Sequence, residues 1–311
     1  MILRKDCNKN LSKAFTLVEL LVVVAVLALL ASIVFSNLTG AREQAKISNA
    51  LSFQSNMHNL LGADLVGWWN FDEDTGNIAK DSSGYGNDGT LKNFNFNDSS
   101  GWSNDTPSPS GYSLKFDGSN DYVDCGKGDS FDITGNQITL SAWIFPFSIA
   151  DNERYYGIIG KDDPMDTNKG YEMRLRSAVS GGTGGIRSRI SNNSGVDTDL
   201  SIISPQNWYH IVVTLNGSEH SVYINGKKEA SVKSTSDIIS TDEILRIGFA
   251  YRTSSPRYFN GFIDDVRIYN HALIATQIEY QYLAGLNNLL AQKKINKADY
   301  LKMSGTIINT Q

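Results

Sequence analysis

The chain has 311 residues, 41% of them hydrophobic, and its formal net charge at pH 7 is −5. This length accommodates one membrane anchor with one large domain or two small ones. After the first 14 residues adjacent basic side chains occur only in the pairs Lys227-Lys228 and Lys293-Lys294, so the composition excludes the basic surface that a nucleic-acid-binding protein needs.

A short basic leader precedes a long apolar run. The leader, residues 1–14, has four basic side chains and one acidic side chain, and residues 15–35 carry a single charge, that of Glu19. About 20 apolar residues span a bilayer, whereas the apolar core of a secretory signal peptide has about 7–15. Because positive residues stay on the cytoplasmic side, we expect a single transmembrane helix with the N-terminus in the cytoplasm and the later residues outside. A signal peptide cut near Ser32 is the alternative.

The start of the apolar run reads Ala14-Phe15-Thr16-Leu17-Val18-Glu19. It resembles the prepilin signature of type IV pilins and type II secretion pseudopilins. This resemblance implies that a prepilin peptidase of the bacterial cytoplasmic membrane cuts between Ala14 and Phe15 and methylates the new amine. The family usually has glycine before the cut, where this chain has Ala14. Loss of four positive charges and one negative charge would change the net charge from −5 to −8.

Glu19 becomes the fifth residue of the processed chain. A charged group inside a membrane is costly, so the carboxylate needs a partner. The resemblance implies pairing with the free amine of a neighbouring pilin or pseudopilin subunit, which compensates both charges. The alternative is that Glu19 lies at the cytoplasmic interface of an ordinary anchor.

The helix is expected to continue beyond the membrane. Ala50, Phe53, Met57 and Leu60 recur at spacings of three and four, which is typical of an amphipathic helix. Gly62 is a plausible stop. The predicted pilin-like helix therefore covers residues 15–63.

Residues 64–284 have a sequence pattern typical of β-strands and turns. Clusters of glycine, serine, asparagine and aspartate separate short runs of aromatic and β-branched residues, which favours an all-β sandwich or barrel. The turns Asn216-Gly217 and Asn225-Gly226 separate three strand-like runs and predict a meander. In residues 138–145, alternation predicts one face formed by Ile138, Leu140, Ala142 and Ile144.

Six segments of this region, in order, resemble the laminin-G-like, concanavalin-A-like jelly roll: residues 65–73, 81–91, 114–123, 208–210, 222–227 and 262–273. The resemblance implies two stacked antiparallel sheets in which the first strand, near Trp69, pairs with the last, near Asp264. It also implies a structural calcium ion in many members and glycan or protein binding in some.

The predicted calcium site combines Asp81 and Asn87, in a glycine-serine loop, with Asp264. Such loops supply oxygen ligands. Alternation places Asp264 on the same buried face as Phe262 and Val266, where a lone carboxylate would be expensive. In the alternative interpretation Asp264 accepts hydrogen bonds from backbone amides and Asp81 forms an Asx turn.

Glycan binding is a second expectation, and catalysis is not expected. Adjacent Asp264 and Asp265 are expected to point to opposite faces, whereas glycosidases need two carboxylates facing one cleft. The four histidines are dispersed, and His210 is expected to pack in a sheet. Aromatic residues in loop-like stretches could stack on sugars: Trp102, Tyr112, Tyr155, Tyr156, Tyr251 and Tyr258.

Residues 285–311 are predicted to form a tail of short amphipathic helices. Cys125 is the only cysteine left once Cys7 departs with the leader, and we expect it to be buried. The sequence therefore predicts a mainly β protein with four parts: leader 1–14, helix 15–63, jelly roll 64–284 and tail 285–311.

The predicted function is that of a pilin-like or pseudopilin-like subunit, minor or at the tip, that displays a glycan-binding or protein-binding domain on a surface filament. A membrane-tethered lectin or adhesin outside any filament is the alternative.

Overall fold

The computed structural model describes residues 16–32, the single positions 45, 48 and 52, and residues 64–308 apart from short gaps. The gaps are at 109–110, 150–154, 164–165, 167, 179–181, 192–194 and 251–256. The chain divides into two compact units, Met1–Ser48 and Asn49–Gln311.

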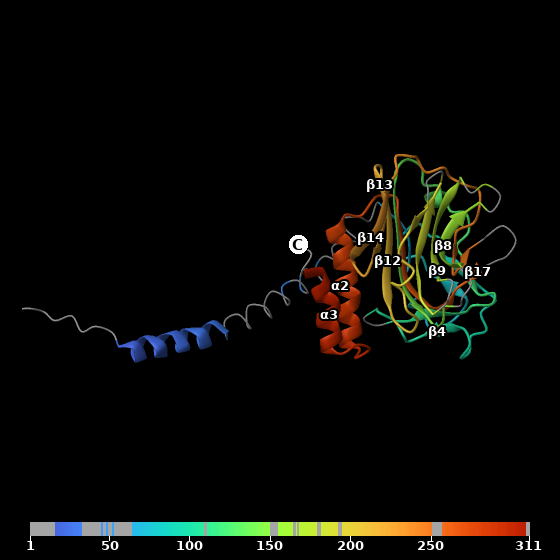
Figure 1. Ribbon diagram of the computed structural model, residues 1–311. Coiled ribbons are helices and arrows are strands. Elements are labelled where there is room, and N and C mark those ends of the chain that lie inside the picture. The colour runs from blue at the N-terminus through green and yellow to red at the C-terminus, as the bar shows by residue number, and fades with distance from the viewer. Residues whose placement is uncertain are drawn as a thin grey trace, which may run out of the picture. The chain divides into compact units, whose positions relative to one another are not determined.

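In the first unit, residues 17–32 form an α-helix (Figure 1). Its side chains are exposed along its whole length. None of the helices in the described part of the chain is both long enough and apolar enough to cross a membrane. The predicted span of residues 15–35 extends beyond the described helix at both ends. Nearly all of its predicted continuation to residue 63 also lies outside the described residues.

The second unit is a β-sandwich with helices on one side. Within the described residues, each of the two main sheets has eight strands. Sheet A contains β1 (Leu65–Trp69), β4 (Gly101–Ser103), β5 (Ser113–Asp117), β7 (Gln137–Pro146), β12 (Tyr209–Asn216), β13 (Glu219–Ile224), β14 (Lys227–Lys233) and β18 (Asn260–Tyr269). Sheet B contains β2 (Ile78–Ala79), β3 (Gly89–Lys92), β6 (Tyr122–Asp124), β8 (Tyr155–Asp162), β9 (Gly170–Ser177), β10 (Gly184–Ile190), β11 (Val196–Asp197) and β15 (Arg246–Ile247).

Shorter elements complete the unit: a 3-10 turn η1 (Asp129–Phe131), the two-stranded pair β16 (Phe249–Ala250) and β17 (Arg257–Tyr258), and the helices α2 (Ala275–Ala291) and α3 (Lys297–Ile308).

Antiparallel pairing between β1 and β18 joins the two ends of the β region. Trp69 lies opposite Val266 and Leu65 opposite Tyr269. β18 also pairs with β7 and β5. It therefore lies inside sheet A, whose strand order is β14-β13-β12-β7-β18-β5-β4. The predicted jelly roll, with its first and last strands paired, is confirmed.

The core lies between the two sheets and follows the alternation of side chains along each strand. Ile138, Leu140, Ala142 and Ile144 of β7 all lie in this core, as predicted. The meander of β12, β13 and β14 is confirmed as well. Its second turn has positive φ at both Asn225 (53°) and Gly226 (80°), the backbone that a tight two-residue hairpin requires.

A bulge in β18 changes the face assignment made for Asp264. Asp265 has φ 47° and the register with β7 shifts between Asp264 and Arg267. Ile263 and Val266 both lie in the core between the sheets. Asp264 therefore shares the opposite, outer face with Phe262, and the expectation that Val266 lies on that same face is wrong because one inserted residue reverses the alternation.

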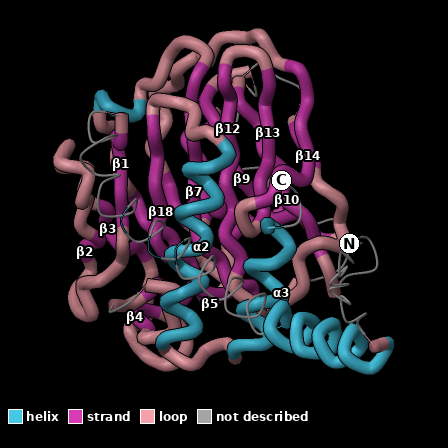
Figure 2. The backbone as a smooth tube through the Cα atoms, turned by 90° about the vertical axis from the view of Figure 1, so that its left-hand side faces the viewer, coloured by secondary structure: helices cyan, strands magenta, loops and turns pink. Residues whose placement is uncertain are grey.

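Helix α2 covers the outer face of sheet A, where it crosses β7 and β18 (Figure 2). The predicted boundary between jelly roll and tail at residue 285 lies inside α2, which runs from Ala275 to Ala291 without interruption. A Cβ added at Gly285 would lie 2.2 Å from Cζ2 of Trp143 on β7. Gly285 therefore allows close contact between helix and sheet.

An aromatic stack attaches α2 to the sheet. The ring of Trp143 lies 5.9 Å from that of Tyr282 and 5.1 Å from that of His210. His210 is 2% exposed, and burial lowers its pKa to about 3, so this imidazole is neutral at physiological pH. The prediction that His210 packs in the sheet is confirmed. Cys125 is also buried, as expected, and burial raises the pKa of its thiol.

Replacing Gly285 with alanine tests the close contact. Gly285→Ala should destabilise the folded unit by about 1–3 kcal/mol, because the added methyl group overpacks the Trp143 contact. The control is Gly305→Ala on α3, where an added Cβ meets nothing within 4 Å and alanine should be neutral or stabilising by up to ~1 kcal/mol. Melting temperatures of the full chain in detergent measure both effects. Equal melting temperatures for the two variants would contradict the packing role.

Candidate functional site

Glu19 closes the first turn of the N-terminal helix. Its carboxylate accepts hydrogen bonds from the Thr16 backbone N–H (2.9 Å) and hydroxyl (2.8 Å), while the Glu19 N–H donates to the Thr16 hydroxyl (3.2 Å). This reciprocal arrangement is a capping box. The carboxylate predicted to pair with a neighbouring subunit thus has a partner in its own helix. The predicted processing residues, Ala14 and Phe15, lie outside the described residues.

The Asp81 loop is held together by hydrogen bonds within the protein. One oxygen of Asp81 accepts the backbone N–H groups of Trp68 (3.0 Å) and Ser83 (2.9 Å), and the other accepts the Ser83 hydroxyl (2.8 Å) and the Asn87 N–H (2.9 Å). The side-chain amide of Asn87 donates to the Val66 carbonyl (3.0 Å) and to the Ser130 hydroxyl (2.8 Å). Asp81 forms the Asx turn of the alternative interpretation and ties the loop to β1.

Asp264 has a separate set of partners. One of its oxygens accepts the Asp265 N–H (2.7 Å), and the other accepts the hydroxyls of Thr106 and Ser108. Asp264 is completely buried, and burial together with the nearby Asp265 charge raises the pKa of its carboxyl well above the usual range.

The contacts therefore bring Asp81 and Asn87 together, but they do not join Asp264 to that pair. The described residues contain no group of three or more His, Cys, Asp or Glu side chains arranged to hold a metal ion. Hydrogen bonds from the protein already occupy the Asp81 carboxylate. Calcium binding by Asp81, Asn87 and Asp264 stays a prediction.

The calcium prediction is tested by thermal melting of the full chain with calcium and with a chelator. Calcium held by the predicted set would raise the melting temperature, since a ligand that binds only the folded state stabilises it. Asp264→Asn should abolish that rise, while Asp242→Asn, at a side chain that is 96% exposed, should retain it. Identical wild-type melting in the two conditions would contradict calcium binding.

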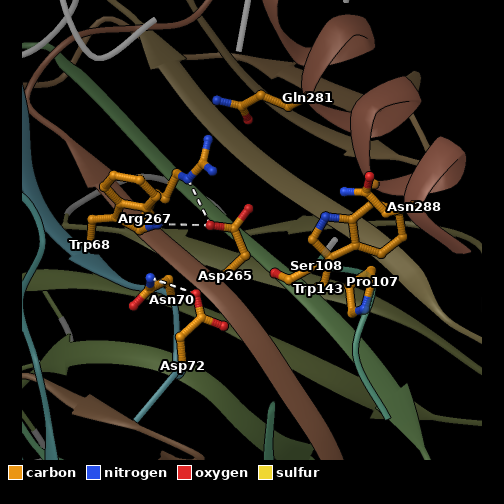
Figure 3. Close-up of a pocket in the computed structure, with 11 residues that line it drawn as sticks. Trp68, Asn70, Asp72, Pro107, Ser108, Trp143, Asp265, Arg267, Gln281 and Asn288 are labelled. Atoms are coloured by element: carbon orange, nitrogen blue, oxygen red, sulfur yellow. Dashed lines mark hydrogen bonds and ion pairs between the residues drawn. The ribbon is translucent and has the colours of Figure 1, made fainter. Parts of the chain in front are cut away.

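The bulge of β18 brings charged side chains to the outer face of sheet A, where α2 closes a pocket of about 240 Å³ (Figure 3). We call it the α2 pocket. Asp265 accepts hydrogen bonds from the Trp68 indole N–H and from Nε of Arg267, both at 2.8 Å. Asp72 accepts hydrogen bonds from the Asn70 amide (2.8 Å) and the Tyr112 N–H (3.2 Å). Asp265 and Arg267 thus face one pocket, and Asp265 is not directed to the face opposite Asp264.

A second pocket, of about 600 Å³, opens beside β4. We call it the Trp102 pocket. The Trp102 indole N–H donates to the Gly76 carbonyl (2.9 Å), and the ring packs partly against the core, so its orientation is set. Phe96, 47% exposed, lies in the same pocket. Exposed polar side chains complete the lining: Asp74, Thr75, Asn77, Asn97 and Asp98.

The other aromatic candidates for sugar stacking have different environments. The Tyr155 ring lies under the guanidinium groups of Arg176 (5.9 Å) and Arg187 (6.0 Å). Tyr156 packs against the core, and Tyr258 against Phe249. Tyr112 contributes its backbone N–H to Asp72, and Tyr251 lies outside the described residues. Of the six predicted aromatic residues, Trp102 is the one that the structure places in a described pocket.

Sequence reasoning missed most of the residues that line these two pockets. No signal in the sequence singles out Asp72, Asp74, Phe96 or Gln281. The only signal was the pair Asp264-Asp265, whose polar character interrupts an apolar strand. The amino-acid sequence does not indicate the bulge at Asp265. The placement of Asp265 and Arg267 on one face therefore could not be predicted.

Two family models match the chain. The model described as the prokaryotic N-terminal methylation motif matches residues 9–35. The model of the concanavalin A-like lectin/glucanases superfamily matches residues 117–279, just over half of the chain. The chain belongs to the concanavalin A-like lectin/glucanases superfamily. A prepilin-type N-terminus is therefore joined to a laminin-G-like jelly roll in one protein, as predicted.

Curated relatives of this superfamily member match only a segment. The sortilin-related receptors of Oryctolagus cuniculus and Mus musculus are each 28% identical, over 114 and 113 residues. The matches cover 37% and 36% of this chain and 4% of each receptor.

Solved structures share the jelly-roll fold at low identity. Domain 4 of AbnA, a GH43 extracellular arabinanase from Geobacillus stearothermophilus, in complex with arabinotriose, has a TM-score of 0.50 and 21% identity over 71% of this chain and 98% of that one. The ligand-binding domain of botulinum neurotoxin serotype D in complex with N-acetylneuraminic acid has a TM-score of 0.52 and 17% identity over 73% of this chain and 52% of that one. At these identities the likeness shows the fold alone.

Proposed function

We propose that the protein is a pilin-like or pseudopilin-like subunit that displays a carbohydrate-binding jelly roll on a bacterial surface filament. In this proposal a prepilin peptidase removes residues 1–14, the N-terminal helix anchors the chain in the cytoplasmic membrane and then packs into the filament, and the β unit lies outside. The methylation motif at residues 9–35 supports the first part. The bulk of the β unit favours a minor or tip position, where a large head does not obstruct neighbouring subunits.

The Trp102 pocket is the observation that carries the binding proposal. An immobilised indole and an exposed phenyl ring supply apolar faces, and the carboxylates and amides around them accept and donate hydrogen bonds. Sugars present both kinds of surface, so an apolar face with a few well-placed polar groups suits them. Two relatives with this fold were solved with sugars, arabinotriose and N-acetylneuraminic acid, which makes these two compounds reasonable first probes.

Binding is tested by titrating the full chain with arabinotriose and with N-acetylneuraminic acid. Trp102→Ala should weaken binding at least ten-fold, which corresponds to about 1.4 kcal/mol, because the stacking face is lost. The matched control is Tyr85→Ala, at an aromatic side chain that is 51% exposed outside the pocket. Wild-type affinity in Trp102→Ala, or no binding of either sugar, would contradict carbohydrate binding in this pocket.

The filament proposal is tested with Glu19→Ala and Thr16→Val. If the carboxylate pairs with the amine of a neighbouring subunit, Glu19→Ala should abolish incorporation while Thr16→Val, which removes only the hydroxyl of the capping box, should retain it. Incorporation is measured in sheared surface filaments, and intact mass establishes whether the wild-type chain begins at Phe15 with one methyl group.

Equal loss in the two variants would assign Glu19 to helix capping. A processed wild-type chain that is absent from filaments would contradict the filament proposal and favour the tethered lectin or adhesin. A mass retaining Met1, or one starting near Ser32, would remove the prepilin interpretation altogether.

A further inference from the structure

The α2 pocket lies on the outer face of sheet A, the face that points away from sheet B. It shares no lining residue with the Trp102 pocket. Its walls come from the end of β1, the bulged part of β18, the loop at Pro107-Ser108 and helix α2. The C-terminal end of α2 is tied to this loop: the Gln292 amide donates to the Ser108 carbonyl, and Lys294 pairs with Asp105 at 3.2 Å. The pocket is therefore built by the docked helix.

The charges in the pocket do not cancel. Arg267 lies 2.8 Å from Asp265, and the two form an ion pair. Asp72 is the other carboxylate in the lining, and no basic side chain other than Arg267 lines the pocket among the described residues. The hydrogen bonds that Asp265 accepts from Trp68 and Arg267 end on the same oxygen. The pocket therefore has an excess of one negative charge.

A buried acceptor in the wall lacks a partner. Gln281 of α2 is 7% exposed, and its amide nitrogen donates to the Tyr269 hydroxyl at 3.1 Å. Its amide oxygen has no hydrogen-bond partner among the described residues. In Figure 3 this oxygen points toward the space above Asp265 and Arg267. A buried polar atom without a partner is costly, so this site needs a hydrogen-bond donor.

The aromatic rings of the pocket already pack against other side chains. The guanidinium of Arg267 lies 4.9 Å from the centre of the Trp68 ring, and Trp143 is stacked with Tyr282 and His210. The volume of about 240 Å³ far exceeds the ~30 Å³ share of one water molecule, so the pocket can hold a small organic molecule.

We propose that the α2 pocket binds a small molecule through a primary ammonium group, which donates hydrogen bonds to the unpaired oxygen of Gln281 and to the carboxylate of Asp265, while Asp72 adds negative charge to the pocket. An ammonium group has three donors and no acceptor. It therefore suits acceptors that have no partner and neutralises the excess negative charge. Pro107, Trp143 and Gly285 supply apolar surface for the rest of the ligand.

The test compares cyclohexylamine with cyclohexanol, which have nearly the same shape and differ in the ammonium group. Both are titrated calorimetrically at pH 7 against the full chain in a non-ionic detergent. We expect saturable binding of the amine and at least ten-fold weaker binding of the alcohol. Equal binding of the two, or no binding of the amine, would overturn the proposal.

Two variants of Gln281 show whether a change in amine binding comes from a changed contact with the ligand or from a damaged fold. Gln281→Leu should weaken amine binding about ten-fold, because the acceptor is lost. Gln281→Glu should strengthen it several-fold, because a carboxylate replaces a neutral oxygen at the same place, an effect that damage to the fold would not produce. Weaker amine binding in Gln281→Glu would overturn the proposal.

Trp102→Ala serves as the control and should bind the amine as the wild type does, since Trp102 lies outside the α2 pocket. Loss of amine binding in Trp102→Ala would place the amine in the other pocket and overturn this assignment. Amine binding and sugar binding can thus fail independently of one another.

Discussion

The pairing of β18 with β1 and β7 is the constraint on which the rest of the β unit depends. β18 is ten residues long and lies in the middle of sheet A, so its hydrogen bonds join segments that are about 200 residues apart in the chain. The bulge at Asp265 sits within this strand. It keeps Ile263 and Val266 in the core and at the same time directs Asp265 and Arg267 to the outer face. One inserted residue thus preserves core packing on one side of the sheet and places charged side chains in a pocket on the other side.

Sheet A is covered on both faces, which is less common for an antiparallel sheet than exposure of one face. The sandwich core covers one face, and α2 covers part of the other through the Trp143–Tyr282 stack and a smaller apolar cluster that includes Val212, Tyr269 and Ile278. Gly285 allows this approach. Because the helix supplies Gln281 and Asn288 to the α2 pocket, the same packing that stabilises the unit also forms the pocket.

The two units combine different physical roles. The N-terminal helix exposes apolar side chains and closes its first turn with Thr16 and Glu19, as suits a segment that packs against lipid or other helices. The β unit is acidic and presents pockets built from loops and edges. Its Trp102 pocket is lined by an indole and a phenyl ring with polar side chains around them, whereas its α2 pocket has an ion pair and an excess of negative charge. These differences explain why we assign sugars to one pocket and amines to the other.

The sequence by itself determined the prepilin motif, the jelly-roll class, the meander of β12 to β14 and the inward face of β7. The first two follow from the resemblance of whole segments to known families, and the last two from local patterns, namely Asn-Gly turns and alternation along a strand. Only the tertiary structure decided where Asp264 and Asp265 point, because a bulge arises from the register between strands and leaves no periodic signal. It also decided that Gly285 lies inside a helix, since the reason is the Trp143 ring more than 140 residues earlier in the chain. Pockets formed by distant segments, such as Asp72 with Gln281, could not be predicted for the same reason.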